Sequence, residues 1–275
     1  GGAGVTNVVL DWLLVGVLRW GLVGAAAATA VSQAVGGVIP LIYFARENSS
    51  LLRLTRCPFD GAVLLKTCAN GSSELMSNIS MSVVSMLYNG QLMAKAGEDG
   101  VAAYGVLMYV SMVFQAIFIG YAVGTAPVVG YHHGAGNRGE LKDLLRRSVL
   151  LIGGFSAAMC LAGETLGRPL SVIFVGYDPD LLDMTAHAFA IFSVAFLFSG
   201  FAIFGSSFFT ALNDGLTSAL ISFLRTLVFQ CAAVIIFPIL WGLDGIWWSI
   251  VAAEVMAVAV TLAFLIGKRK KYGYA

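Results

Sequence analysis

Long apolar stretches alternate with short polar ones along the whole chain. A helix needs about 20 apolar residues to cross the hydrocarbon core of a membrane, and eight stretches reach or approach that length. They cover residues 1–18, 21–45, 68–93, 101–130, 148–165, 185–211, 216–240 and 245–267. Their regular length favours helices, because the strands of a membrane barrel give shorter segments of alternating polarity. The pattern therefore predicts an all-α integral membrane protein with eight transmembrane helices.

Composition agrees with this prediction. The chain is 59% hydrophobic and only 11% charged, whereas soluble domains carry about 25% charged residues. It contains no nucleotide-binding loop and no hydrolase, metalloprotease or dinucleotide motif. We therefore expect no enzymatic activity and no nucleic-acid partner, and any transport would take its energy from an ion gradient.

The four cysteines are not paired by a CxxC or a metal-site spacing. Cys57, Cys68, Cys160 and Cys231 are far apart in the sequence, so we expect free thiols and no metal site.

The positions of the basic residues predict the topology. An even number of spans separates three basic clusters, so all three fall on one side of the membrane. Basic loops mark the cytoplasmic side, which places the C-terminus in the cytoplasm of a multi-pass plasma-membrane protein. The clusters are Arg46, Arg53, Arg56 and Lys66; Arg138, Lys142, Arg146 and Arg147; and Lys268, Arg269, Lys270 and Lys271. The longer inner connections are predicted at 46–66 and 131–147, and an outer loop at 166–183.

Polar residues stand within the first two apolar stretches. Asn7 and Asp11 are four residues apart and share one helix face, and Thr29 and Gln33 repeat that spacing on the next helix. Carboxylate, amide and hydroxyl oxygens suit Na⁺, or a protonatable carboxylate that competes with it. Intramembrane carboxylates usually mark ion or proton pathways. The alternative is a buried Asp that is hydrogen-bonded for structural reasons alone.

A polar stripe follows the third apolar stretch. At 100° per residue, Asn78, Ser82, Ser85 and Asn89 lie within 80° of Glu74 on one helix face. In lipid such a stripe must face protein or a watery cavity. It indicates a substrate cavity, with hydrogen bonding between helices as the alternative.

A further carboxylate lies within the last apolar stretch. Glu254 is either another functional site or the partner of Arg225. The sequence leaves both possibilities open.

Five segments together resemble the multidrug and toxic compound extrusion (MATE) family of transporters. The longest is "VAAYGVLMYVSMVFQAIFIGYAVGTAPVVGYHHGAGNRGELKDLLRRS", at 101–148, which is similar to the eighth helix of that family and the inner loop that follows. The other four occur in the order found in the family. They are "NVVLDWLLV", "GAAAATAVSQ", "NGSSELMSNISMSVVSMLYN" and "GLDGIWWSIVAAE".

This resemblance implies an organisation in two lobes of six helices, of which the chain would contain helices five to twelve. Helices one to four would be missing and would be required for function. The implied parts are the remainder of the N-terminal lobe at 1–45, an inter-lobe linker at 46–60, a C-terminal lobe at 61–267 and a basic tail at 268–275.

The resemblance also implies an activity: exchange of Na⁺ or H⁺ for organic, often cationic, drugs by alternating access, with no other cofactor. Asn7, Asp11 and Thr29 match the family's cation or protonation site in the N-terminal lobe. Glu74 matches a carboxylate of the seventh helix. With Gln33, Asn78, Ser82, Ser85 and Asn89, it is expected to line the substrate cavity.

Three alternatives remain at this point. A lipid-linked oligosaccharide flippase of related architecture would need a cationic cavity, whereas the spans carry mainly acidic residues. A membrane enzyme would need a His or Cys cluster near one interface. The chain by itself is also compatible with an inactive fragment.

Overall fold

The computed structural model describes residues 2–46 and 60–274, apart from the side chains of residues 66, 69–74, 76 and 77. In these ranges all regular secondary structure is helical. Contacts divide the chain into two compact units, Gly1–Asp60 and Gly61–Ala275. The predicted inter-lobe linker at 46–60 lies almost wholly outside the described residues.

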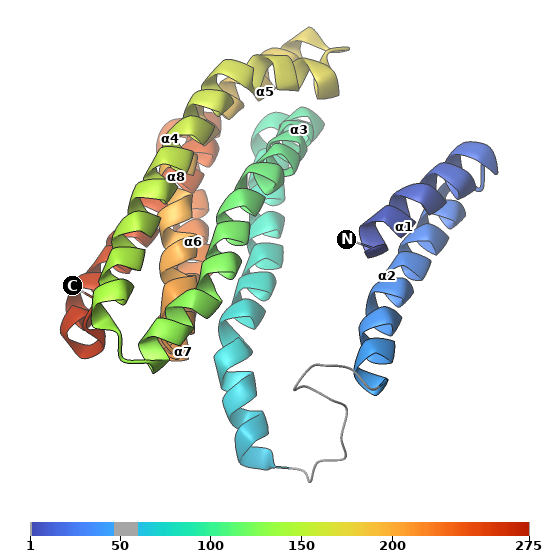
Figure 1. The fold of residues 1–275 in the computed structure, drawn as a ribbon. Coiled ribbons are helices and arrows are strands. Elements are labelled where there is room, and N and C mark those ends of the chain that lie inside the picture. The colour runs from blue at the N-terminus through green and yellow to red at the C-terminus, as the bar shows by residue number, and fades with distance from the viewer. Residues whose placement is uncertain (1, 47–59, 275) are drawn as a thin grey trace. The chain divides into compact units, whose positions relative to one another are not determined.

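The first unit is a helical hairpin (Figure 1). Its first arm consists of α1 (Gly2–Asp11) and the π-helical segment η1 (Trp12–Val17), and its second arm is α2 (Gly21–Ala45). The buried face of α2 carries only Gly24, Ala28 and Ser32. A Cβ at Gly24 would lie 3.1 Å from the backbone oxygen of Leu14, so small residues allow the two backbones to approach closely.

The second unit begins with a long helical hairpin, α3 (Gly61–Gly134). Gly97 interrupts it with φ 64° and ψ −149°, a conformation that glycine adopts without steric cost. The chain reverses there, because the stacked rings of Tyr88 and Tyr104 are 5.2 Å apart, whereas 16 residues of straight helix would separate them by about 24 Å. Figure 1 shows the two arms side by side.

The C-terminal helices contain a similar reversal at a glycine. After α7 (Gly215–Phe223) and the π-helical segment η2 (Leu224–Phe229), the helix α8 (Gln230–Tyr272) is interrupted at Gly242, with φ 61° and ψ −131°. The Tyr88 hydroxyl lies 2.8 Å from atoms of both Gln230 and Ser249, which are on different arms of α8. The two arms therefore pack against each other.

Three helices complete this unit: α4 (Arg138–Val175), α5 (Pro179–Ser193) and α6 (Phe196–Ala211). The last two form one pass with a bend of 50°. A Cβ at Gly163 would lie 2.6 Å from Ser193 Cβ, and one at Gly167 would lie 2.9 Å from the Phe189 ring. Glycines on α4 thus allow α5 to pack closely.

The passes agree with the eight predicted spans. Four helices are long and apolar enough to cross a membrane, the bent pair adds a fifth candidate, and Gly2–Val17 is a shorter apolar helix. Two of the four, Asn78–Gly134 and Gly215–Tyr272, contain the reversals at Gly97 and Gly242 and therefore provide two passes each. The prediction of an all-α membrane protein is confirmed.

One predicted connection is largely helical, and one predicted loop is wrong. Residues 131–147 are almost entirely helical, because α3 ends at Gly134 and α4 begins at Arg138. The predicted outer loop at 166–183 is helical up to Val175 and again from Pro179. Hydropathy indicates which residues suit hydrocarbon, but it does not indicate where a helix ends. In this protein the helices continue beyond their apolar part into polar sequence.

The basic C-terminal end of the second unit is held by a buried carboxylate. Asp214 precedes α7, is 9% exposed, and accepts hydrogen bonds from Lys268 Nζ at 2.6 Å and Tyr272 Oη at 2.7 Å. Burial raises the pKa of Asp214, but the hydrogen bonds from Lys268, Tyr272 and Thr217 outweigh it and hold the pKa at about 2. This contact fixes the loop at 212–214 to the end of α8.

Replacing Asp214 by Asn should lower thermal stability in a pH-dependent way. The folded pKa of about 2 lies below the ordinary value of 3.8, so the carboxylate stabilises the fold above pH 3.8 and loses this effect as the pH falls towards 2. We expect a loss of about 2 kcal/mol at neutral pH, or about 4–8 °C in the unfolding midpoint. Thermal unfolding in detergent checks this, and a deficit that persists below pH 2 contradicts it.

Candidate functional site

The first group of predicted site residues lies on the first arm of the first unit. Asn7 and Asp11 are half-buried on α1, one turn apart. Asp11 is the residue at which the α-helix gives way to the π-helical segment η1. Such segments are rare in helices and occur frequently at functional sites. Among the residues that the structure describes, none forms a hydrogen bond or ion pair with the Asp11 carboxylate.

Thr29 and Gln33 are on α2 and are exposed within the first unit. The Thr29 hydroxyl donates to the carbonyl oxygen of Ala25 at 3.0 Å. The face of α2 that packs on the first arm is the neighbouring one, with Ala28 and Ser32. In the described part of the chain, no hydrogen bond joins Thr29 or Gln33 to Asn7 or Asp11. A cation site shared by residues of α1 and α2 therefore remains a prediction.

The polar stripe of α3 lies beside the buried face of that helix. Asn78 and Ser82 are exposed, whereas Ser85 and Asn89 are half-buried and joined by a hydrogen bond of 3.5 Å from Asn89 Nδ2 to Ser85 Oγ. The side chain of Glu74 lies outside the described residues. The assignment of this stripe to a substrate cavity also remains a prediction.

A charged pair occupies the interior of the second unit. Arg225 on η2 holds Glu254 on α8 with three contacts: Nη2 to Oε1 at 2.8 Å, and Nε to Oε2 and Oε1 at 3.0 and 3.1 Å. The side chain of Arg225 is only 15% exposed, and that of Glu254 only 7%. Of the two possibilities that the sequence left open for Glu254, the pair with Arg225 is the one observed.

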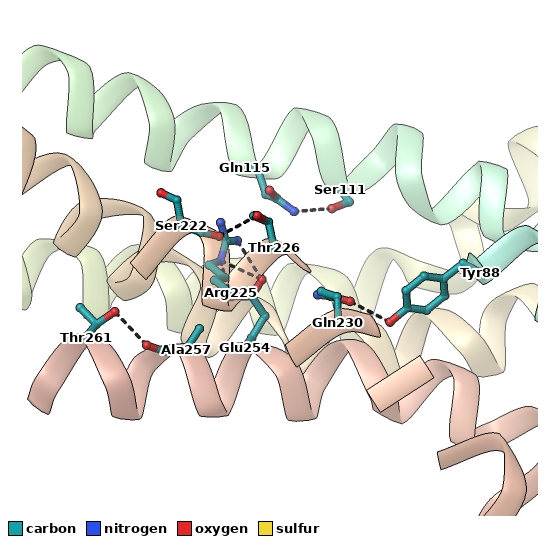
Figure 2. Close-up of polar contacts among 10 residues, drawn as sticks. All are labelled: Tyr88, Ser111, Gln115, Ser222, Arg225, Thr226, Gln230, Glu254, Ala257 and Thr261. Atoms are coloured by element: carbon teal, nitrogen blue, oxygen red, sulfur yellow. Dashed lines mark hydrogen bonds and ion pairs between the residues drawn. The ribbon is translucent and has the colours of Figure 1, made fainter. Parts of the chain in front are cut away.

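Polar side chains surround this pair. In the view of Figure 2, Thr226 and Gln115 lie on the side of Arg225 opposite Glu254. The Thr226 hydroxyl donates to the carbonyl oxygen of Ser222 at 2.6 Å, and the Gln115 amide donates to Ser111 Oγ at 2.9 Å. The pair thus lies among hydroxyl and amide groups that come from α3 and η2.

Tyr88 joins three helical segments further along the same interior. It is 1% exposed and donates its hydroxyl to Gln230 Oε1 at 2.8 Å (Figure 2). It also shares a hydrogen bond of 2.8 Å with Ser249 Oγ. The sequence did not indicate the contacts of Tyr88 with Gln230 and Ser249. No sequence pattern links residues on three different segments.

Hydroxyl groups form a second network that the sequence did not indicate. Ser206 on α6 lies 2.8 Å from both Ser218 and Ser222 on α7, and Thr210 donates to Ser218 at 2.7 Å. In an apolar interior each hydroxyl needs such a partner. This network ties α6 to α7, which leads directly into η2.

A groove of about 1000 Å³ lies between the two arms of α8, away from these polar residues. Its lining is apolar apart from Asp244 and includes Ile236, Trp241, Trp248 and Met256, all of them exposed. Such a surface suits lipid chains, so we do not assign a polar substrate to it.

The fold and these interior polar groups define a multi-pass helical membrane protein. A family model described as MatE matches residues 74–236 of the chain. Because this match covers more than half of the chain, the protein belongs to the MatE family, whose members are transporters.

Individual relatives agree with this assignment. The multidrug export protein MepA of Staphylococcus aureus (strain MSSA476) is 22% identical over 266 residues, which cover 96% of this chain and 58% of that protein. A crystal structure of a MATE protein in complex with MaL6 covers the whole chain with a TM-score of 0.90 at 22% identity, and 62% of that protein is matched. An outward-facing multidrug resistance MATE transporter gives a TM-score of 0.89 at 22% identity. The chain therefore spans about three-fifths of the length of these relatives.

Tyr88→Phe should destabilise the second unit, because it removes the hydroxyl that satisfies Gln230 and contacts Ser249. A lost buried hydrogen bond of this kind costs about 1–3 kcal/mol, or about 2–12 °C in the unfolding midpoint. Tyr104→Phe is the matched control, since Tyr104 stacks on Tyr88 but its hydroxyl bonds to no described residue. Equal midpoints for the two variants would show that the hydrogen bonds contribute nothing.

Proposed function

We propose that the protein to which this chain belongs exports organic, often cationic, compounds by antiport against Na⁺ or H⁺. Membership of the MatE family and the similarity to MepA support export of drugs. The residues that we assign to cation binding or protonation are Asn7, Asp11 and Thr29. The C-terminus would be cytoplasmic, on the basis of the basic clusters.

One observation carries the assignment of Asp11. Among the carboxylates whose side chains the structure describes, Asp11 and Glu254 lie well inside the apolar spans, and they differ in their partners. Glu254 is neutralised by Arg225, whereas Asp11 meets no cation among the described residues. A carboxylate at the bilayer centre costs roughly 2.5–3.5 kcal/mol on insertion scales. Binding a proton or Na⁺ removes this cost, and Asp11 is therefore the group best suited to a coupling ion.

The substrate would be attracted by the polar stripe on α3. Glu74, Asn78, Ser82, Ser85 and Asn89 offer oxygens that suit an organic cation. The drug and the coupling ion would then favour different states of the transporter, each through its differential affinity.

A lipid-linked oligosaccharide flippase is less well supported. Its pyrophosphate would need unpaired basic residues within the membrane. Arg225 is the basic residue at that depth in the described spans, and its guanidinium is already paired with Glu254.

Asp11→Asn should abolish coupled export. The assay is ethidium efflux from cells that express the chain with its native flanking sequence, with a Na⁺ gradient alone and with a proton gradient alone. We expect efflux under one gradient to fall at least about tenfold, as for loss of an essential group. Glu164→Gln is the control, because Glu164 is an exposed carboxylate on α4 bonded to Ser193. Normal efflux by the Asp11→Asn protein would refute the assignment.

Glu74→Gln should weaken export of cationic dyes more than export of neutral ones, because the amide loses the charge but keeps the shape. We expect the concentration for half-maximal efflux of cations to rise about tenfold, which corresponds to about 1.4 kcal/mol. Glu98→Gln, in an exposed turn, is the control. Unchanged efflux of every cation tested would remove Glu74 from the substrate site.

A further inference from the structure

Among the described residues, Arg225 and Glu254 form an ion pair only with each other. No other Asp, Glu, Lys or Arg occurs in residues 101–130, 188–211, 215–243 or 245–267. The nearby titratable groups are Tyr88 and Tyr104 on α3 and Cys231 on α8, and all three are uncharged in their ordinary states at neutral pH. Within these four segments the net charge therefore depends on the pair alone.

A carboxylate at this depth can be neutralised in three ways: by a proton, by a metal cation, or by a basic side chain. In this structure the guanidinium takes that role with three N–H contacts to the two oxygens of Glu254. A guanidinium does not lose its proton in proteins. The neutralising charge at Glu254 is therefore permanent and covalently attached to the chain.

The surroundings of the guanidinium would also suit a free cation. Thr226 donates its hydroxyl hydrogen to Ser222, so its oxygen keeps its lone pairs for another group, and the Gln115 amide supplies a further oxygen (Figure 2). Carboxylate, hydroxyl and amide oxygens are the ligands that hard cations prefer. Without the guanidinium, the carboxylate of Glu254 would be left with polar neighbours of this kind and no cation.

We propose that Arg225 is a tethered cation that occupies the position of a coupling ion at Glu254, and thereby prevents this carboxylate from taking up Na⁺ or a proton. The position of Arg225 in the π-helical segment η2 supports this role, because such segments concentrate at functional sites. The proposal rests on the proposed cation coupling. Arg225 would limit how many ions the transporter couples to export, and it would not bind the substrate.

The test measures ion-dependent stability and not transport, so it can fail or succeed independently of the proposed function. All proteins carry Asp11→Asn, which removes the ion expected at that residue. The variants are Arg225→Met, the double variant Arg225→Met with Glu254→Met, and Arg225→Lys, which keeps the positive charge. The unfolding midpoint in detergent is followed against Na⁺, balanced with choline, and separately against pH.

The midpoint of Arg225→Met should rise with Na⁺ or with falling pH, and which of the two does so identifies the ion. For a site that becomes saturated, about a hundredfold rise in ion concentration should raise the midpoint by about 5 °C or more. The double variant and Arg225→Lys should lack this rise. Arg225→Gln is the second variant if Arg225→Met does not fold, because its amide can still bond to Glu254 without charge.

Two results would overturn the proposal. In the first, Arg225→Met or Arg225→Gln responds to neither ion beyond the double variant, so that no cation position exists at Glu254. In the second, the protein with Arg225 intact shows an ion response that the double variant lacks, so that Glu254 takes up an ion even in the presence of the guanidinium.

Discussion

Hydrocarbon offers no hydrogen-bond partner, and each polar group in the membrane interior of this protein must therefore find one within the chain. Helices satisfy the backbone, and hydroxyl and amide side chains satisfy one another. The pair of Arg225 and Glu254 is the strongest case, because three short contacts offset the removal of two charges from water. The arrangement of α3, η2 and α8 around it follows from that requirement.

Close helix packing makes these contacts possible. Gly97 and Gly242 reverse the chain within single turns, which places the two arms of α3 and of α8 side by side. Gly163 and Gly167 admit α5 against α4. At the basic end, Asp214 holds the end of α8 through Lys268 and Tyr272. Small residues thus determine where two helices can pack closely. Hydrogen bonds and ion pairs between polar residues then stabilise that packing.

Asp11 and Glu254, the intramembrane carboxylates whose side chains are described, illustrate a division of roles. Glu254 has a permanent partner and stabilises the second unit. Asp11 lacks a described partner and stands where an α-helix becomes a π-helix. A group that must bind and release an ion cannot be neutralised permanently, whereas a structural charge must be. This difference is the physical basis for assigning ion coupling to the first unit and a blocked cation position to the second.

The sequence by itself determined the class of protein and the number of spans, because hydropathy reports directly which residues suit hydrocarbon. Motifs in order along the chain predicted the family. The sequence did not determine where the helices end, since α4 continues into polar sequence at both ends. Only the tertiary structure decided between the two roles open to Glu254 and placed Tyr88 against Gln230 and Ser249. Those contacts join residues 29 to 161 positions apart, and such separations leave no local pattern that a sequence alone can reveal.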